Sequence, residues 1–119
     1  MENKYKYFTE EEFNKLVPSC SLSDMDEDFM KRLDTARHIA GIPFVLNCAF
    51  RSEKWDKEKG RSGNSFHCKG QAVDIKCGDS KNRALIIYSL WLCGIKGIGI
   101  YPNFVHADFR KEPICFLGV

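Results

Sequence analysis

Three short segments of this sequence alternate between apolar and polar residues, and this alternation constrains the fold more than any other feature. They are FVLNCAFR (44–51), QAVDIKC (71–77) and FVHADFR (104–110). Successive side chains of a β-strand point to opposite faces of a sheet, so each segment is predicted to bury one row of side chains. The opposite row carries Arg51 in the first segment, Asp74 in the second, and His106 with Asp108 in the third. Each predicted strand therefore turns a reactive group away from the core.

Helical periodicity and capping signals surround the predicted strands. Three helices are expected, beginning at Thr9, Ser23 and Ser80 and ending before Pro18, at Gly41 and at Gly94. The third is apolar on nearly every side, which predicts deep burial. Residues 52–65, SEKWDKEKGRSGNS, show neither the helical nor the strand period. They are predicted to form a surface loop that leads into His67.

Length and charge restrict the class of protein. A chain of 119 residues is expected to form one domain, residues 1–119, because a second core would leave both parts too small. The 18 Lys and Arg against 16 Asp and Glu leave a net charge of +2, which does not favour nucleic acid as a partner. No run approaches the roughly 20 apolar residues of a membrane span. The first residues, MENKYKYFTEEE, lack the apolar segment of a secretory signal. We expect a monomer that is made in the cytoplasm without a signal peptide and has no membrane partner.

Six cysteines occur, but none forms a Cys-x-x-Cys pair and most lie in apolar runs. We expect reduced thiols that act as small apolar residues. A cysteine hydrolase with Cys68 or Cys48 as nucleophile is a further alternative. Cys68 adjoins His67, but adjacent residues of an extended chain point apart, so the two make a poor nucleophile and base pair.

Two of the three histidines lie in a pattern that suits a metal. His38 falls within the second predicted helix without an acidic or cysteine partner, so we interpret it as a surface or capping residue. His67 precedes Asp74 by seven residues across a turn that Gly70 permits, and His106 comes from another strand. Two imidazoles and one carboxylate form a three-ligand catalytic zinc set that leaves a position open for water. Taken as spacing alone, the pattern is weak, and unconnected polar residues explain it better.

The text around these residues is more specific than their spacing. The motifs are AFRS (49–52), SFHCKGQAVDI (65–75) and GIKGIGIYPNFVHADFR (94–110). In this order and spacing they resemble the M15 metallopeptidases, in particular the group of zinc D-Ala-D-Ala carboxypeptidases and phage L-alanyl-D-glutamate endopeptidases. The resemblance extends from FTEEEF (8–13) to Arg110. It implies an α+β fold with a small antiparallel sheet and helices packed on one side.

The resemblance also assigns roles to individual residues. It implies that His67, Asp74 and His106 bind Zn²⁺. It implies that Arg51 holds a substrate carboxylate or polarises the scissile carbonyl, for which a rigid guanidinium is suited. A surface salt bridge is the alternative for Arg51. Ser65 matches a serine that borders the substrate site, although its hydroxyl could instead satisfy a backbone group.

The general base is the point where the sequence departs from the family pattern. Related enzymes often carry an acid or a histidine about three residues before the last zinc ligand, and here that position is Asn103, whose amide cannot accept the proton of water. Asp108 shares the face of His106 at roughly 7 Å along the strand. It could act as the catalytic base or as the hydrogen-bond partner of a ligand histidine.

The resemblance implies zinc-dependent hydrolysis of peptidoglycan stem peptides, with either a terminal D-Ala-D-Ala or an internal L-Ala-D-Glu bond as the target. Peptidoglycan peptides are the expected partner. Without an export signal, action on the cell wall would fit a phage or prophage lysis enzyme that is released by a separate membrane-permeabilising protein. A zinc-stabilised module that binds peptidoglycan without cleaving it is the alternative.

Overall fold

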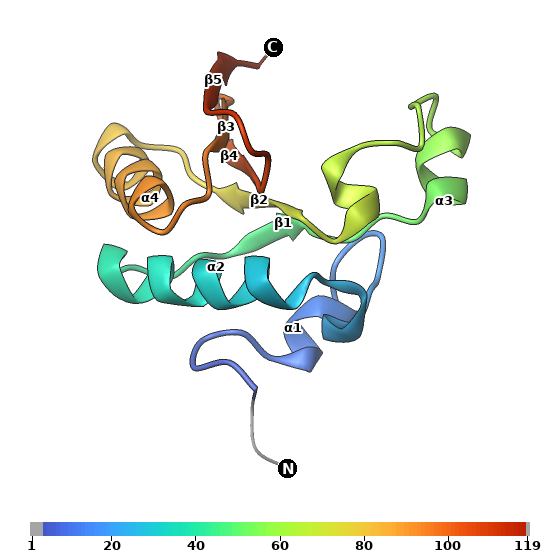
Figure 1. Cartoon of the computed structure of the whole chain (residues 1–119), viewed down its shortest axis with the longest axis horizontal. Helices are drawn as coiled ribbons and strands as arrows, with labels where there is room; N and C mark the ends of the chain where they lie inside the picture. The colour runs from blue at the N-terminus through green and yellow to red at the C-terminus, as the bar shows by residue number, and fades with distance from the viewer. Residues whose placement is uncertain (1–3, 119) are drawn as a thin grey trace.

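A five-stranded sheet forms the centre of the protein, which the computed structural model describes for residues 4–118 (Figure 1). The strands are β1 (Leu46–Cys48), β2 (Ala72–Lys76), β3 (Gly97–Ile100), β4 (Phe104–Asp108) and β5 (Ile114–Leu117). Their order in the sheet is β1-β2-β4-β3-β5. All neighbouring pairs are antiparallel except β3 and β5, which run parallel. The predicted α+β class and antiparallel sheet are confirmed, with β5 as a parallel addition at one edge.

The two longest helices cover one face of this sheet. The α-helices are α1 (Glu10–Asn14), α2 (Glu27–Ala40), α3 (Glu53–Glu58) and α4 (Ser80–Leu92), and the 3-10 helices are η1 (Leu22–Asp24) and η2 (Phe66–Lys69). In Figure 1, α2 lies below β1 and β2, and α4 lies beside the sheet at the same end as the last turns of α2. Val73 and Ile75 of β2 and Val105 of β4 are fully buried among the helix side chains. The alternate residues of these strands therefore face the other way, where no helix covers the strands' centres. None of the helices in residues 4–118 has the length and apolar character that crossing a bilayer would require.

Helix boundaries follow local capping chemistry, which corrects two of the predicted start points. The hydroxyl of Thr9 caps α1, as predicted, by accepting a hydrogen bond from the amide of Glu12. Asp26, not Ser23, caps α2, because its carboxylate accepts from the Phe29 amide at 2.9 Å. Ser23 belongs instead to η1. The cap of α4 is Asp79, one residue before the predicted Ser80. In both cases the cap is an aspartate carboxylate and not the predicted serine hydroxyl. A carboxylate also interacts favourably with the positive end of the helix.

The prediction of deep burial for α4 is wrong. Tyr88, Trp91 and Leu92 are 63%, 41% and 57% exposed. The helix lies at the outside of the fold and presents one side to α2 and the sheet, so only Ile86, Ser89 and Leu90 are buried. Apolar residues around its whole circumference allow a helix to be buried. The elements packed against it determine which of its side chains are buried.

The predicted surface loop at residues 52–65 contains the helix α3. Ser52 caps it by accepting a hydrogen bond from the amide of Trp55 at 3.0 Å. The residue that α3 turns inward is Asp56, which is fully buried and lies 3.1 Å from Arg51 Nε. A helix whose inward side chain is charged has no apolar period, which explains why periodicity missed it.

A candidate metal centre in an open cleft

His67 is fixed between the end of β1 and the start of β2. It lies in η2, and Gly70 ends this turn in the left-handed conformation with φ of 69°. The imidazole is 3% exposed, and its Nδ1 lies 2.7 Å from the carbonyl oxygen of Ala49. Because a carbonyl can only accept, Nδ1 carries the proton and donates it, which leaves the lone pair of Nε2 available. That nitrogen lies 3.3 Å from Asp74 Oδ1.

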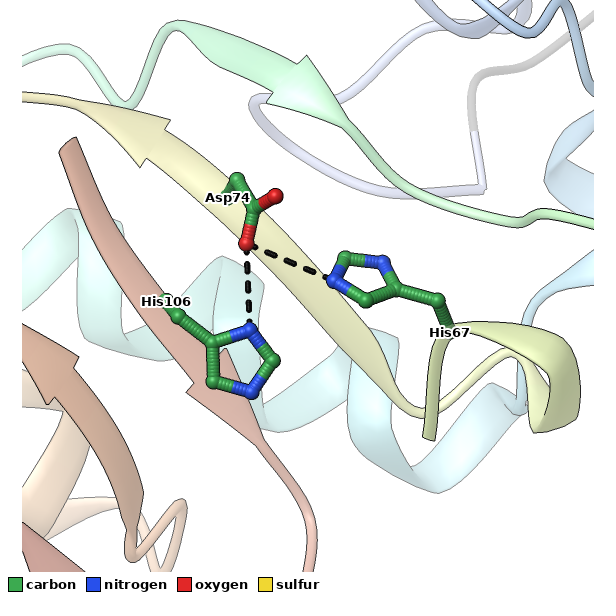
Figure 2. Close-up of side chains that lie close together, drawn as sticks. All are labelled: His67, Asp74 and His106. Carbon is green, nitrogen blue, oxygen red and sulfur yellow. Dashed lines mark hydrogen bonds and ion pairs between the residues drawn. The ribbon is translucent and has the colours of Figure 1, made fainter. Parts of the chain in front are cut away.

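Asp74 and His106 meet across the sheet. They are direct cross-strand partners in the register of β2 and β4, and Asp74 Oδ1 lies 3.1 Å from His106 Nδ1. The ligand atoms of His67, Asp74 and His106 all lie within 4.8 Å of one another (Figure 2). Figure 2 shows the Asp74 carboxylate between the two imidazoles, which approach it from η2 and from β4. The structure therefore brings the three predicted ligands together.

Asp108 holds the other nitrogen of His106. Its Oδ2 accepts from His106 Nε2 at 2.8 Å, and Arg110 donates from Nε and Nη2 at 2.8 and 2.6 Å. The carboxylate is fully buried. Gly97 lies opposite Asp108 in β3, and a Cβ at that position would overlap Asp108 Oδ1. A hydrogen bond from Nε2–H to Asp108 leaves the lone pair of Nδ1 facing Asp74 and His67.

The electrostatics of this cluster favour a cation. Burial raises the pKa of Asp74, but its contacts with His106 and His67 outweigh burial and hold the pKa well below the usual range. Burial lowers the pKa of His106, whereas the two flanking carboxylates more than compensate and raise it to about 9. Burial also raises the pKa of Asp108, which Arg110 and His106 nevertheless bring down to about 2. Two ionised carboxylates around one imidazole attract positive charge, either a proton on His106 or a metal ion.

The donor set fits a divalent transition metal such as zinc. Two imidazole nitrogens and one carboxylate oxygen match the ligands of catalytic zinc sites. Each imidazole has one nitrogen free to coordinate because its other nitrogen donates to the carbonyl oxygen of Ala49 in His67 and to Asp108 in His106. Within residues 4–118, no fourth His, Cys, Asp or Glu joins the group. The Sγ atom of Cys48 lies 4.0 Å from His67 Nδ1, and Nδ1 is on the opposite side of the ring from the candidate ligand atom Nε2. Its burial raises the pKa of the thiol to about 11, so Cys48 is a poor nucleophile as well.

The cluster opens into a cleft of about 420 Å³. Arg51, Ser65 and Asp108, the other predicted site residues, line it together with the three ligands. Arg51 is only 12% exposed, lies 3.1 Å from Asp56 Oδ1 and donates from Nη2 to Ser65 Oγ at 3.4 Å. Arg51 therefore forms a buried ion pair within the cleft wall, and not the surface salt bridge that was its alternative interpretation.

Several cleft residues were not predicted from the sequence. They are Arg61, Phe66, Tyr101, Phe104, Arg110 and Phe116. Phe116 belongs to β5, whose place beside β3 no local pattern indicates. Arg61 follows α3 in the segment that was predicted to be a loop. The presence of three arginines in one cleft could not be inferred, because they come from three separate segments.

Two other candidates lie away from the cleft. Asn103 is exposed in the turn between β3 and β4, and its carbonyl oxygen accepts from the Cys77 amide at 3.0 Å. It is not among the residues that line the cleft. His38 is exposed on α2, where its Nδ1 lies 2.6 Å from the Tyr7 hydroxyl, in agreement with its prediction as a surface residue.

Two histidines and an aspartate that meet in an open cleft match the ligand set of metallohydrolases with a catalytic zinc ion. The chain belongs to the peptidase M15 family, whose family model matches residues 6–108. This range contains all three candidate ligands and β1 to β4. The resemblance that the sequence motifs indicated is thus confirmed, and the family is in general zinc-dependent. A search of curated proteins found no match to the chain.

Proposed function

We propose that this protein is a zinc-dependent peptidase that hydrolyses peptide bonds in peptidoglycan stem peptides. The observation that carries the proposal is the convergence of His67, Asp74 and His106 in an open cleft that also contains Arg51. Membership of a peptidase family supports the reaction class. A zinc ion in this site would supply Lewis acidity, which activates water and polarises an amide carbonyl.

The chain's own residues prepare the site for this chemistry. The carbonyl of Ala49 and the carboxylate of Asp108 each bind the outward nitrogen of a ligand histidine, so both rings present a lone pair to the same point. Arg51, held by Asp56 and Ser65, is placed to bind a carboxylate or a carbonyl oxygen of the substrate. The position of Asp108 favours a positioning role over that of the base, because it is fully buried and already binds His106 and Arg110.

A non-catalytic module that binds peptidoglycan is a second candidate, and one observation favours it. Among residues 4–118, the only acids that line the cleft are Asp74 and Asp108, and both are engaged by histidines. A peptidase would then need another group to move the proton of water. Under this alternative the metal would stabilise the fold and the arginines would bind the peptide.

Incubation of the zinc-loaded protein with purified muropeptides distinguishes the two candidates. We expect new stem-peptide fragments in the mass spectrum, and their masses identify the bond: loss of one D-Ala for a carboxypeptidase, or cleavage after L-Ala for an endopeptidase. His106→Ala should abolish both zinc binding and cleavage. Unchanged masses combined with co-sedimentation of the protein with cell walls would favour the binding module.

The role as a phage lysis enzyme rests on the resemblance to the phage endopeptidase group. We expect that cytoplasmic expression in a bacterium causes lysis only when a membrane-permeabilising protein is produced at the same time. Lysis that is equally fast without the second protein would contradict this role.

A further inference from the structure

A second pocket adjoins the cleft and is lined by basic side chains. It has a volume of about 720 Å³, and it shares Phe66 and Arg110 with the cleft. Its basic residues are Arg32, Lys69, Lys96, Arg110 and Lys111, and none of the acidic residues that the structure describes lines it. We call this space the basic pocket. Because the two spaces have these two lining residues in common, one extended molecule could occupy both.

The arginines of the basic pocket are held in place. Arg32 reaches from α2, where Asp28 binds its Nε at 3.2 Å and the carbonyl of Cys93 accepts from Nη1 at 3.0 Å. Its guanidinium lies 5.3 Å from the centre of the Phe109 ring. Arg110 is bound by Asp108 and lies 5.2 Å from the centre of the Phe66 ring. Such contacts reduce the conformational entropy that these long side chains would lose on binding an anion.

The lysines leave this pocket with uncompensated charge. Within residues 4–118, Lys69, Lys96 and Lys111 have no carboxylate within 4.0 Å, whereas Arg32 and Arg110 each have one. Of the five basic side chains, two are paired with a carboxylate, Arg32 with Asp28 and Arg110 with Asp108. The other three leave an excess of three positive charges around one pocket. The whole chain carries a net charge of only +2. Positive charge is therefore concentrated beside the cleft, where it raises the local concentration of anions.

Resting on the peptidase function proposed above, we propose that the basic pocket binds a carboxylate of the substrate peptide and so selects acidic peptides. The residues shared by the two spaces favour a peptide over an unrelated anion. Arg110 and Phe66 line both spaces, and Arg110 is linked through Asp108 to His106. A peptide whose scissile bond lies at the cluster would extend past Phe66 and place its next free carboxylate among the three lysines.

The test uses two stem peptides that differ in one charge. Both have the sequence L-Ala-γ-D-Glu-L-Lys-D-Ala-D-Ala, and the α-carboxylate of D-Glu is free in one and amidated in the other. We expect kcat/KM to be roughly tenfold higher for the free carboxylate, since a few partly exposed ion pairs are individually weak but act together. The triple variant Lys69→Gln, Lys96→Gln, Lys111→Gln should bring the ratio close to one. Added salt should reduce the preference of the unmodified protein.

A matched triple variant separates the pocket from the overall charge. Lys6, Lys54 and Lys81 are exposed, lie outside the cleft and the basic pocket, and have no ion-pair partner in the part of the chain that the structure describes. Replacing these three with Gln removes the same net charge and should preserve the preference. An equal loss of preference in both triple variants would overturn the proposal, as would equal kcat/KM for the two peptides in the unmodified protein.

Failure of the peptidase function gives a different result from failure of this inference. If neither peptide is cleaved, the peptidase function falls, and calorimetric titration of the same two peptides tests the pocket directly. Tighter binding of the free carboxylate, lost in Lys69→Gln, Lys96→Gln, Lys111→Gln, would support the pocket. Equal binding of both peptides would overturn it, and so would strong binding of poly(glycerol phosphate) with no preference between the peptides.

Discussion

Replacing Asp108 with Asn tests the arrangement behind His106. Both oxygens of Asp108 act as hydrogen-bond acceptors. Oδ2 accepts from His106 Nε2 and Arg110 Nη2, and Oδ1 accepts from the Arg110 Nε and backbone amide. An asparagine has one oxygen and one NH₂ group, so at least one of these contacts becomes a clash of two donors. The buried position prevents water from taking over the lost contact. His106 would lose the partner that keeps the proton on Nε2.

The expected magnitude follows from these contacts. Loss of the partner of a metal-binding histidine weakens metal affinity by about 10- to 100-fold, which is about 1.4 to 2.7 kcal/mol. A hydrogen bond to a charged group contributes about 1.5 to 3 kcal/mol. Since the Arg110 side chain is 29% exposed and can find water, we expect a loss of unfolding free energy at the low end of that range.

Zinc affinity, measured by competition with a chromophoric chelator, and turnover at saturating zinc separate the two roles of Asp108. A positioning role predicts weak zinc binding and a turnover that is largely restored when zinc saturates the site. Asp56→Asn is the matched control, because Asp56 is also fully buried and pairs with an arginine but contacts none of the three ligands. It should leave zinc affinity unchanged. Normal zinc affinity in Asp108→Asn with turnover reduced by 10²-fold or more at saturation would refute the positioning role and identify Asp108 as the base.

Three further predictions concern the metal, the packing against Asp108 and the hydrophobic core. Zinc at a free concentration of 100 times its Kd should stabilise the protein by about 2.7 kcal/mol in thermal unfolding, and His106→Ala should remove this gain. Gly97→Ala should lower zinc affinity in the chelator assay, because its Cβ would overlap Asp108 Oδ1, whereas Gly78→Ala has nothing within 4 Å and should not. Leu33→Ala, in the fully buried face of α2, should cost about 2 to 5 kcal/mol in urea denaturation. The 57% exposed Leu92 is its control, and a comparable loss in Leu92→Ala would contradict the assigned core.

The central strands and the family motifs could be predicted because both are local properties of the chain. Alternation in residues 71–77 and 104–110 assigned Asp74 and His106 to the uncovered face, and the structure places them there. The segment 44–51 was less regular than predicted. Its strand covers only Leu46–Cys48, where the register with β2 shifts, and Ala49 is buried although alternation turned it outward.

The elements that were missed depend on partners distant in sequence. β3 contains two glycines, which disfavour a strand unless neighbouring side chains need the space. Here Phe116 and Asp108 take that space, beside Gly99 and Gly97. α3 turns inward a charged residue, Asp56, whose carboxylate lies 3.1 Å from Arg51 Nε and accepts from the Gly63 amide at 3.0 Å. No pattern within either segment reveals these partners.

The sequence by itself determined which side chains share the polar face of each strand and which family the motifs resemble, because side-chain alternation and motif spacing are written along the backbone. The tertiary structure alone decided that Asp74 stands directly opposite His106, and that Ala49 and Asp108 select the nitrogen each histidine presents. It also decided that five basic residues from four segments surround one pocket beside the cleft. Register, tautomer and charge clustering arise from contacts between residues far apart in the chain, which are set only when the whole core packs.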